Sequence, residues 1–299
     1  MMLDWLAYAV ARLAFGALEM LPWNTGRSVA RSLGHVAYLL DRGSRKATAV
    51  ANLQRAFPAM SRSEAKRVLR RVYSNFLGAI LDGLQVRRFI GHWPLDRLVE
   101  VKGMDKLDGL PEKTGVVFVT GHFGCWEVLG LCGSALGGTL WTVARMFDNV
   151  FAQRHVQRLR ESAGQRMLPK EGAFRHMVRL VREGRNVALL MDQDVRRHGV
   201  FVDFFGRPAS TTPAAARIAL RTGAPVAFVY ARQVPGRNRF RVVLKDVVWP
   251  RPGADRRKEV RRITQRITGD LEEVVREAPD EWLWLHRRWK TYPGKYAGR

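Results

Sequence analysis

One histidine and one glutamate lie five residues apart, at His122 and Glu127, within the sequence TGHFGCWE. A carboxylate that contacts one imidazole nitrogen fixes the tautomer and makes the other nitrogen a better base. Because no serine or cysteine nucleophile motif is nearby, such a pair suits direct attack by a substrate hydroxyl. A purely structural contact between the two side chains is the alternative, and spacing alone does not decide between them.

The elements around this pair determine whether the two side chains can meet. In one continuous helix, residues five apart point about 140° apart. The pair can therefore meet only if His122 lies in a turn and Glu127 in the first turns of a helix, and Gly121 and Gly124 permit a tight turn. The apolar run 115–120 predicts a buried strand directly before it. Loops after strands of a parallel sheet commonly carry catalytic groups.

Cysteine and serine side chains are the other possible nucleophiles. Cys125 could act as a thiol, although a cysteine between glycine and tryptophan at the start of a buried helix favours packing. Ser134 and Ser210 lack the G-x-S-x-G context of a serine hydrolase.

A second polar cluster follows another expected strand. Asp192 and Asp194 come after the apolar run 186–191, and the segment leads to Ser210 and Thr211. Carboxylates beyond strand ends suit the positioning of a polar headgroup. Ser210 and Thr211 resemble a helix N-cap whose backbone amides could face an anion. An ordinary loop before a capped helix is the alternative.

The first hundred residues are expected to be helical. Residues 5–22 are mostly apolar, but Asp4, Tyr8, Arg12 and Glu19 share one side of a helix. This polar stripe favours a helix lying in a membrane interface, with a membrane span and a soluble core helix as alternatives. A signal peptide is disfavoured because no basic n-region or A-x-A site is present.

Beyond these segments the pattern predicts one α/β unit. Helical periodicity covers 27–40 and 65–81, the latter opening with a capping box. From about residue 103 strands and helices alternate, which predicts a mixed, largely parallel sheet flanked by helices. We expect an N-terminal helical, membrane-associated region at 1–100 and an α/β core at 101–299. Strands are expected at 115–120, 140–144, 186–191, 225–230 and 240–244, and helices at 128–136, 150–163, 173–183, 214–220 and 255–277.

Composition limits the partners. The chain has 51 Lys and Arg against 27 Asp and Glu, a net charge of +24. Such a surface attracts nucleic acid, anionic lipid or an acidic protein, although a GC-rich genome also enriches arginine. Two cysteines and the scattered histidines fit no disulfide scaffold or metal site, so neither a metal nor another cofactor is expected.

Taken in order, the motifs resemble the lipid A biosynthesis lauroyl/myristoyl acyltransferases, a branch of the lysophospholipid acyltransferase superfamily. The resemblance covers about residues 5–292 and depends on the ordered set, since each motif alone is weak. Met146 departs from it, because relatives often have proline there. The matching segments are His122-x4-Glu127, Asn52-Leu-Gln-Arg-Ala-Phe-Pro58, Arg145 with Asp148-Asn149, Asp192-Gln-Asp194, Phe204-Phe-Gly206, Ser210-Thr-Thr-Pro213, Gly223-Ala-Pro225-Val226 and Trp282–Lys290.

The resemblance implies that His122 deprotonates an acceptor hydroxyl while Glu127 orients His122. The donor would be acyl carrier protein or acyl-CoA, and the acceptor a lipid A-type precursor or related glycolipid at the cytoplasmic face of the bacterial inner membrane. Arg145, and also Arg158 or Arg160, would meet phosphate or the developing oxyanion, while Asp192 and Asp194 would support the acceptor site.

Other functions remain open from the sequence. A lysophospholipid or a phosphatidylinositol mannoside is the alternative acceptor. A non-catalytic basic protein that binds membrane or nucleic acid is the alternative of another class, although no nucleic-acid motif appears. The Trp-rich segment 282–290 fits either an interfacial aromatic belt or helix packing.

Overall fold

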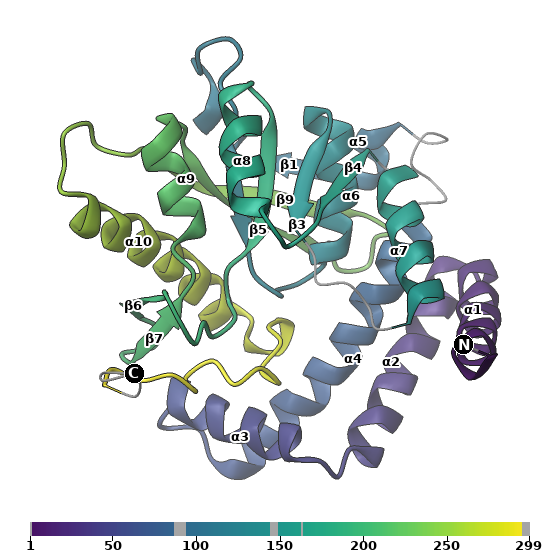
Figure 1. The fold of residues 1–299 in the computed structure, drawn as a ribbon. Coiled ribbons are helices and arrows are strands. Elements are labelled where there is room, and N and C mark those ends of the chain that lie inside the picture. Colours follow the sequence, from purple (N-terminus) through teal and green to yellow (C-terminus); the bar gives the residue numbers. More distant parts are fainter. Residues whose placement is uncertain (1, 87–93, 144–148, 163, 295–299) are drawn as a thin grey trace.

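The computed structural model describes residues 2–86, 94–143, 149–162 and 164–294. Strands and α-helices alternate from β2 to β5, and the strands β6 and β7 follow before α9 (Figure 1). The α-helices are α1 (Met2–Met20), α2 (Trp23–Leu40), α3 (Ser44–Ala56), α4 (Arg62–Val86), α5 (Leu95–Leu98), α6 (Trp126–Gly137), α7 (Val150–Ser162), α8 (Ala173–Arg182), α9 (Ala214–Thr222) and α10 (Arg256–Glu277), with 3₁₀ turns η1 (Met104–Leu107) and η2 (Pro279–Glu281). The strands are β1 (Val99–Lys102), β2 (Val117–Thr120), β3 (Leu140–Val143), β4 (Gln165–Leu168), β5 (Asn186–Leu190), β6 (Val200–Asp203), β7 (Pro208–Thr211), β8 (Val226–Gln233) and β9 (Phe240–Val248).

Seven strands form one sheet in the order β1-β9-β8-β2-β5-β3-β4. Only the β8–β9 pair is antiparallel, and β2 lies parallel to both β5 and β8 in the middle of the sheet. The expected fold class, a mixed and largely parallel sheet flanked by helices, is therefore confirmed. Because β2 and β5 run in the same direction, the segments that follow them, at 121 and 191, meet at one edge.

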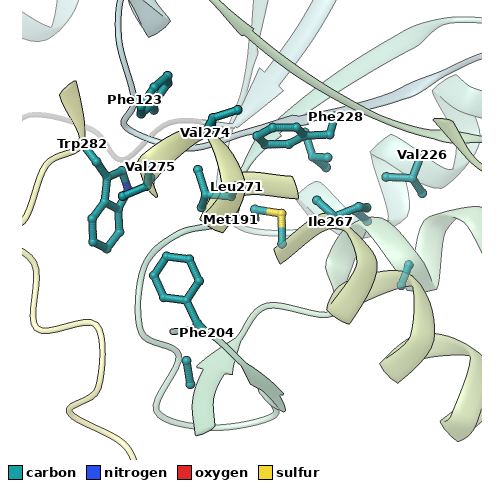
Figure 2. Packing of buried hydrophobic residues seen from close by; sticks show 14 of the residues in the cluster. Phe123, Met191, Phe204, Val226, Phe228, Ile267, Leu271, Val274, Val275 and Trp282 are labelled. Carbon is teal, nitrogen blue, oxygen red and sulfur yellow. The ribbon is translucent and has the colours of Figure 1, made fainter. Parts of the chain in front are cut away.

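The two faces of the sheet are covered by different helices. Alternate residues of β2, β5 and β8 pack with α8, α9 and α10, and this core continues to Phe204 and Trp282 (Figure 2). The opposite side chains of β8 and β9 pack against α6. Both faces are buried, as the short apolar strands require.

The N-terminal helices join the same core. Residues of α3 and α4 belong to the buried cluster that includes β2 and α10. The expected capping box begins α4: the Glu64 amide donates to Ser61 Oγ at 3.2 Å, and the Ser61 amide donates to Glu64 Oε2 at 2.8 Å. Helix α4 also packs along α2 and α6, so it connects the N-terminal region to the centre of the sheet.

Helix α1 packs against α4 and α7. Tyr8 stacks on Phe151 of α7, and Glu19 is buried near Arg12. Within the described residues, no helix is both long and apolar enough to cross a membrane. Large apolar side chains nevertheless remain exposed on α1 and α2, namely Trp5, Leu6, Leu13, Met20, Leu33, Val36, Leu39 and Leu40.

Several elements differ from the sequence expectations. β1 and β4 were not anticipated, because each is a four-residue strand at or near an edge of the sheet with a mixed burial pattern. Ser210 and Thr211 do not cap a helix. They belong to β7, which pairs with β6 in a two-stranded ribbon, while α9 begins after Pro213 without a side-chain cap.

Candidate active site

The turn between β2 and α6 presents His122. Gly124 has φ +56°, and a Cβ there would lie 2.2 Å from the Ala231 carbonyl oxygen, so only glycine fits this turn. The Gly124 amide donates to the Glu281 carbonyl at 3.0 Å, and the Leu283 amide donates to the His122 carbonyl at 3.0 Å. The turn is therefore held by the segment after α10 as well as by the sheet.

Asp192 is the carboxylate that contacts the imidazole. His122 Nδ1 lies 2.9 Å from Asp192 Oδ1, and the His122 amide donates to Oδ2 at 2.7 Å. Trp282 Nε1 donates to the same Oδ2 at 2.9 Å. Asp192 is fully buried, and Gly121 leaves room for it, because a Cβ there would lie 3.2 Å from Oδ2. This arrangement leaves Nε2 of His122 as the nitrogen available to a substrate.

Glu127 lies in the first turn of α6, as the spacing required, but its hydrogen-bond partner differs from the expectation. Its Oε1 accepts from Arg160 Nη2 of α7 at 2.7 Å. The sequence expectation gave Glu127 the orienting contact to His122, whereas in the structure that contact comes from Asp192. The reason is topological: the ends of β2 and β5 adjoin, while the helical path of α6 carries Glu127 toward α7.

The charges around His122 favour its protonated form. Burial alone would lower the pKa of His122, but the charge of Asp192 and its hydrogen bond outweigh burial, and the charge of Glu127 adds to them. The pKa of His122 is therefore raised. Burial alone would raise the pKa of Asp192, yet the charge and hydrogen bonds of His122 hold that pKa well below its usual range.

A pocket opens beside His122. Apolar side chains of α4, the β2–α6 turn and the C-terminal segment form much of its wall. Trp126 separates His122 from α4: its ring lies 5.6 Å from the His122 ring and 5.6 Å from that of Phe76. The pocket is lined by Val72, Asn75, Phe76, His122, Gly124, Trp126, Glu281, Trp282 and Leu283.

The chain is similar to known acyltransferases over most of its length. The family model for bacterial lipid A biosynthesis acyltransferases matches residues 1–291. The chain belongs to this family. The phosphatidylinositol mannoside acyltransferase of Mycobacterium tuberculosis is 31% identical over 203 residues, which are 65% of this chain and 60% of that protein.

Two relatives match over more of their length. The lipid A biosynthesis lauroyltransferase of Escherichia coli K12 is 25% identical, over 97% of this chain and 92% of that protein. The lipid A biosynthesis palmitoleoyltransferase of the same strain is 26% identical, over 83% and 80%. The similarity thus extends from the N-terminal helices to the C-terminal segment of this family member.

Within the family member, Cys125 is a packing residue. Its side chain is 6% exposed, and Sγ lies 3.7 Å from Asp82 Oδ2. Burial, and then the charge of Asp82, raise the pKa of the Cys125 thiol well above its ordinary value, which disfavours a thiolate nucleophile.

Besides Asp192, four of the predicted substrate-binding residues have internal partners. Arg160 binds Glu127, and Asp194 accepts from the Thr291 amide and hydroxyl at 2.9 and 2.8 Å. Ser210 Oγ donates to the Val195 carbonyl at 2.6 Å, and Thr211 is fully buried. These contacts fix loops around the site, so direct binding of a headgroup by Ser210 and Thr211 is not supported.

The other two predicted arginines differ in how far they can be placed. Arg158 is exposed on α7 and remains a candidate for binding phosphate. Arg145 lies outside the described residues, as do Met146 and Asp148.

Sequence reasoning missed the contribution of the C-terminal segment. Trp282 and Trp284 are buried core residues, which supports the packing interpretation for these two tryptophans. His286 lies beside His122, with ring centroids 5.0 Å apart. The Trp-rich motif at 282–290 is visible in the sequence, but nothing in its spacing indicates that it contacts the β2–α6 turn, 160 residues earlier in the chain.

Arg288 is expected to stabilise this segment. Its guanidinium is fully buried, donates to the Ser210 carbonyl at 2.9 Å and bonds Thr211 Oγ1. Burial lowers its pKa to about 10. Replacing Arg288 by methionine leaves those buried acceptors unpaired, so we expect the free energy of unfolding to fall by about 3 kcal/mol. Urea unfolding measures this, with the exposed Arg287→Met as the control; equal losses would contradict the assignment.

Proposed function

We propose that this chain transfers a fatty acyl group from a thioester donor to a hydroxyl of a lipid A-type precursor or related glycolipid. The observation that carries the proposal is His122, held at Nδ1 by buried Asp192, with a small pocket beside it. Family membership supports acyl transfer. The contact of Asp192 with His122 makes His122 a general base, so the reaction needs no nucleophilic side chain.

The proposed reaction is direct transfer. In neutral His122 the Nδ1–H group donates a hydrogen bond to the Asp192 carboxylate. Nε2 is then unprotonated and takes the proton of the acceptor hydroxyl. The hydroxyl oxygen bonds to the thioester carbon, and a tetrahedral intermediate forms. When the carbon–sulfur bond breaks, the proton on Nε2 passes to the departing sulfur, which returns His122 to its neutral form. No cofactor is required. Among the described residues, no group of three or more His, Cys, Asp or Glu side chains could hold a metal ion.

The donor is acyl carrier protein or acyl-CoA in this proposal. A carrier protein is acidic, and the +24 charge of this chain would steer it toward the enzyme. CoA also carries phosphates, for which Arg145 and the exposed Arg158 are the proposed contacts. A thiol leaving group and a thioester carbonyl are common to both donors, so the same site serves either.

A phosphatidylinositol mannoside or a lysophospholipid is the alternative acceptor. The 31% identity to the mycobacterial phosphatidylinositol mannoside acyltransferase favours the former over part of the chain. The longer match to the Escherichia coli lauroyltransferase favours a lipid A-type precursor.

The test is an acyl-transfer assay with purified full-length protein. Radiolabelled lauroyl and palmitoyl thioesters of carrier protein and of CoA are each combined with detergent-solubilised lipid A precursor, phosphatidylinositol mannoside and lysophosphatidic acid. We expect label in a glycolipid product. Label in lysophosphatidic acid alone would contradict the proposed acceptor, and label in no lipid with any donor would contradict the function.

We further propose that α1 and α2 place the enzyme on the inner surface of a membrane. Exposed Leu6, Leu13 and Met20 lie seven residues apart on α1, and exposed Leu33, Val36 and Leu40 follow helical spacing on α2. Apolar faces of this kind, on a strongly basic protein, fit an interfacial helix pair on an anionic membrane.

Membrane binding gives a direct test of this placement. The variant Leu13→Asp/Leu40→Asp puts two charges where apolar side chains would enter lipid, so we expect vesicle affinity to fall at least about a hundredfold. Cosedimentation with vesicles containing anionic phospholipid measures it. Met104→Asp changes an exposed apolar residue on η1 and serves as the control. Equal vesicle binding by both variants would contradict the placement.

A further inference from the structure

A second imidazole lies beside the ring of His122. The ring of His286 has its centroid 5.0 Å from that of His122, and the two planes are inclined by 59°. Gln193 Nε2 lies 3.4 Å from His286 Nε2. Gln193 is exposed, whereas its neighbour Asp192 is fully buried against His122. Of these two consecutive residues after β5, the buried Asp192 therefore contacts His122, and Gln193 contacts His286 near the surface.

The main chain of His286 is held from α3. Asn52, which is 1% exposed, donates through Nδ2 to the Trp284 carbonyl at 3.1 Å and to the His286 carbonyl at 2.7 Å. The Arg288 amide donates to the same His286 carbonyl at 3.0 Å. A side chain on a backbone fixed from two directions can position a substrate, since binding costs little additional ordering.

The chemistry of the pair matches hydroxyl groups. A neutral imidazole and a carboxamide each donate and accept hydrogen bonds, as hydroxyls do. Burial, and then the charge of His122, lower the pKa of His286 against the opposing effect of Asp192, so its neutral form is favoured. On the side of α4 and α6, by contrast, the aromatic rings of Phe76 and Trp126 lie near His122. The base thus has polar and apolar surroundings in different directions.

We propose that His286, with Gln193, binds the polar end of the acceptor and holds its reacting hydroxyl at Nε2 of His122. This inference rests on the proposed acyl transfer. Two adjacent imidazoles can engage two neighbouring oxygens of one acceptor: one loses its proton to His122, and the other hydrogen-bonds His286. The acceptor class is therefore a headgroup with neighbouring hydroxyls, such as a sugar ring. The thioester of the donor approaches His122 from the side of Phe76 and Trp126.

The test distinguishes an effect on the binding of the acceptor from an effect on the cleavage of the donor thioester. His286→Ala and His286→Gln are assayed with a labelled thioester, measuring transfer to a detergent-solubilised glycolipid and hydrolysis of the same thioester by water. For His286→Ala we expect the acceptor KM to rise about tenfold, the loss of one hydrogen bond. The donor KM and the rate of hydrolysis should stay within about twofold. His286→Gln, which keeps a donor and an acceptor, should restore the acceptor KM to within about threefold.

Controls make the outcomes distinct. His176→Ala removes a histidine of α8. It should leave the rate of transfer, the rate of hydrolysis and the KM values for acceptor and donor unchanged. If His286→Ala does not fold, His286→Gln and Gln193→Ala decide, and Gln193→Ala should raise the acceptor KM alone. An unchanged acceptor KM, or equal losses in transfer and hydrolysis, would overturn the role of His286 while leaving acyl transfer intact. Absence of any His122-dependent transfer by the wild type would overturn the proposed function and this inference with it.

Discussion

Replacing His122 by glutamine should lower the turnover number for acyl transfer by about 10³- to 10⁴-fold, while thioester binding stays nearly unchanged. General base catalysis accounts for about 10²- to 10⁴-fold in enzymes, and here no other described side chain holds the same place beside Asp192. Glutamine preserves much of the imidazole volume and can still donate to Asp192, so the turn keeps its shape. Steady-state rates with saturating donor and acceptor measure the loss.

The pH dependence of the wild type adds a second measurement. Only neutral His122 accepts a proton, so kcat/KM should fall as the pH falls through its pKa. Because Asp192 and Glu127 raise that pKa, the midpoint should lie above about 6.5, the ordinary value for histidine. His176→Gln is the control. Full activity of His122→Gln, with an unchanged thermal unfolding curve, would exclude His122 as the base.

The sequence predicted the site best where chemistry and local geometry coincide. The glycines, the preceding apolar run and the spacing to Glu127 required a strand, a turn and a helix, and β2 and α6 provide them. Asp192 was also selected, because it follows another buried strand. The contact of Asp192 with His122 was not predictable from spacing, since the order of the strands decides which strand ends lie side by side. That order depends on contacts between residues far apart in the sequence.

The contribution of the C-terminal segment could not be derived from local pattern. Trp282 and His286 reach the site because the Leu283 amide and the Asn52 side chain attach that segment to the β2–α6 turn and to α3. Each contact joins residues more than 150 positions apart. For Ser210 and Thr211 the local pattern predicted the wrong structure. Their residue types suit a helix cap, but they lie in β7, which pairs with β6, and both accept hydrogen bonds from the buried Arg288.

Asp192→Asn should lower the turnover number by about 10²- to 10³-fold, more than Glu127→Gln, for which we expect about tenfold. An asparagine at 192 keeps the shape but loses the charge, and its amide can donate to Nδ1, which places the proton on Nε2 where the base must be free. Glu127→Gln instead ends the ion pair with Arg160 and removes a more weakly acting charge.

Two pH measurements distinguish the roles of these carboxylates. Both substitutions remove negative charge near His122, so both should shift the acid limb of kcat/KM to lower pH, and Asp192→Asn should shift it further. The depressed pKa of Asp192 means that its carboxylate stabilises the fold above about pH 4, its unfolded value, and that this contribution is lost as the pH falls toward the folded value. Asp192→Asn should therefore flatten the acid unfolding profile in that range. A larger loss of turnover from Glu127→Gln would instead assign the orienting role to Glu127, with the contact to Asp192 serving the turn alone.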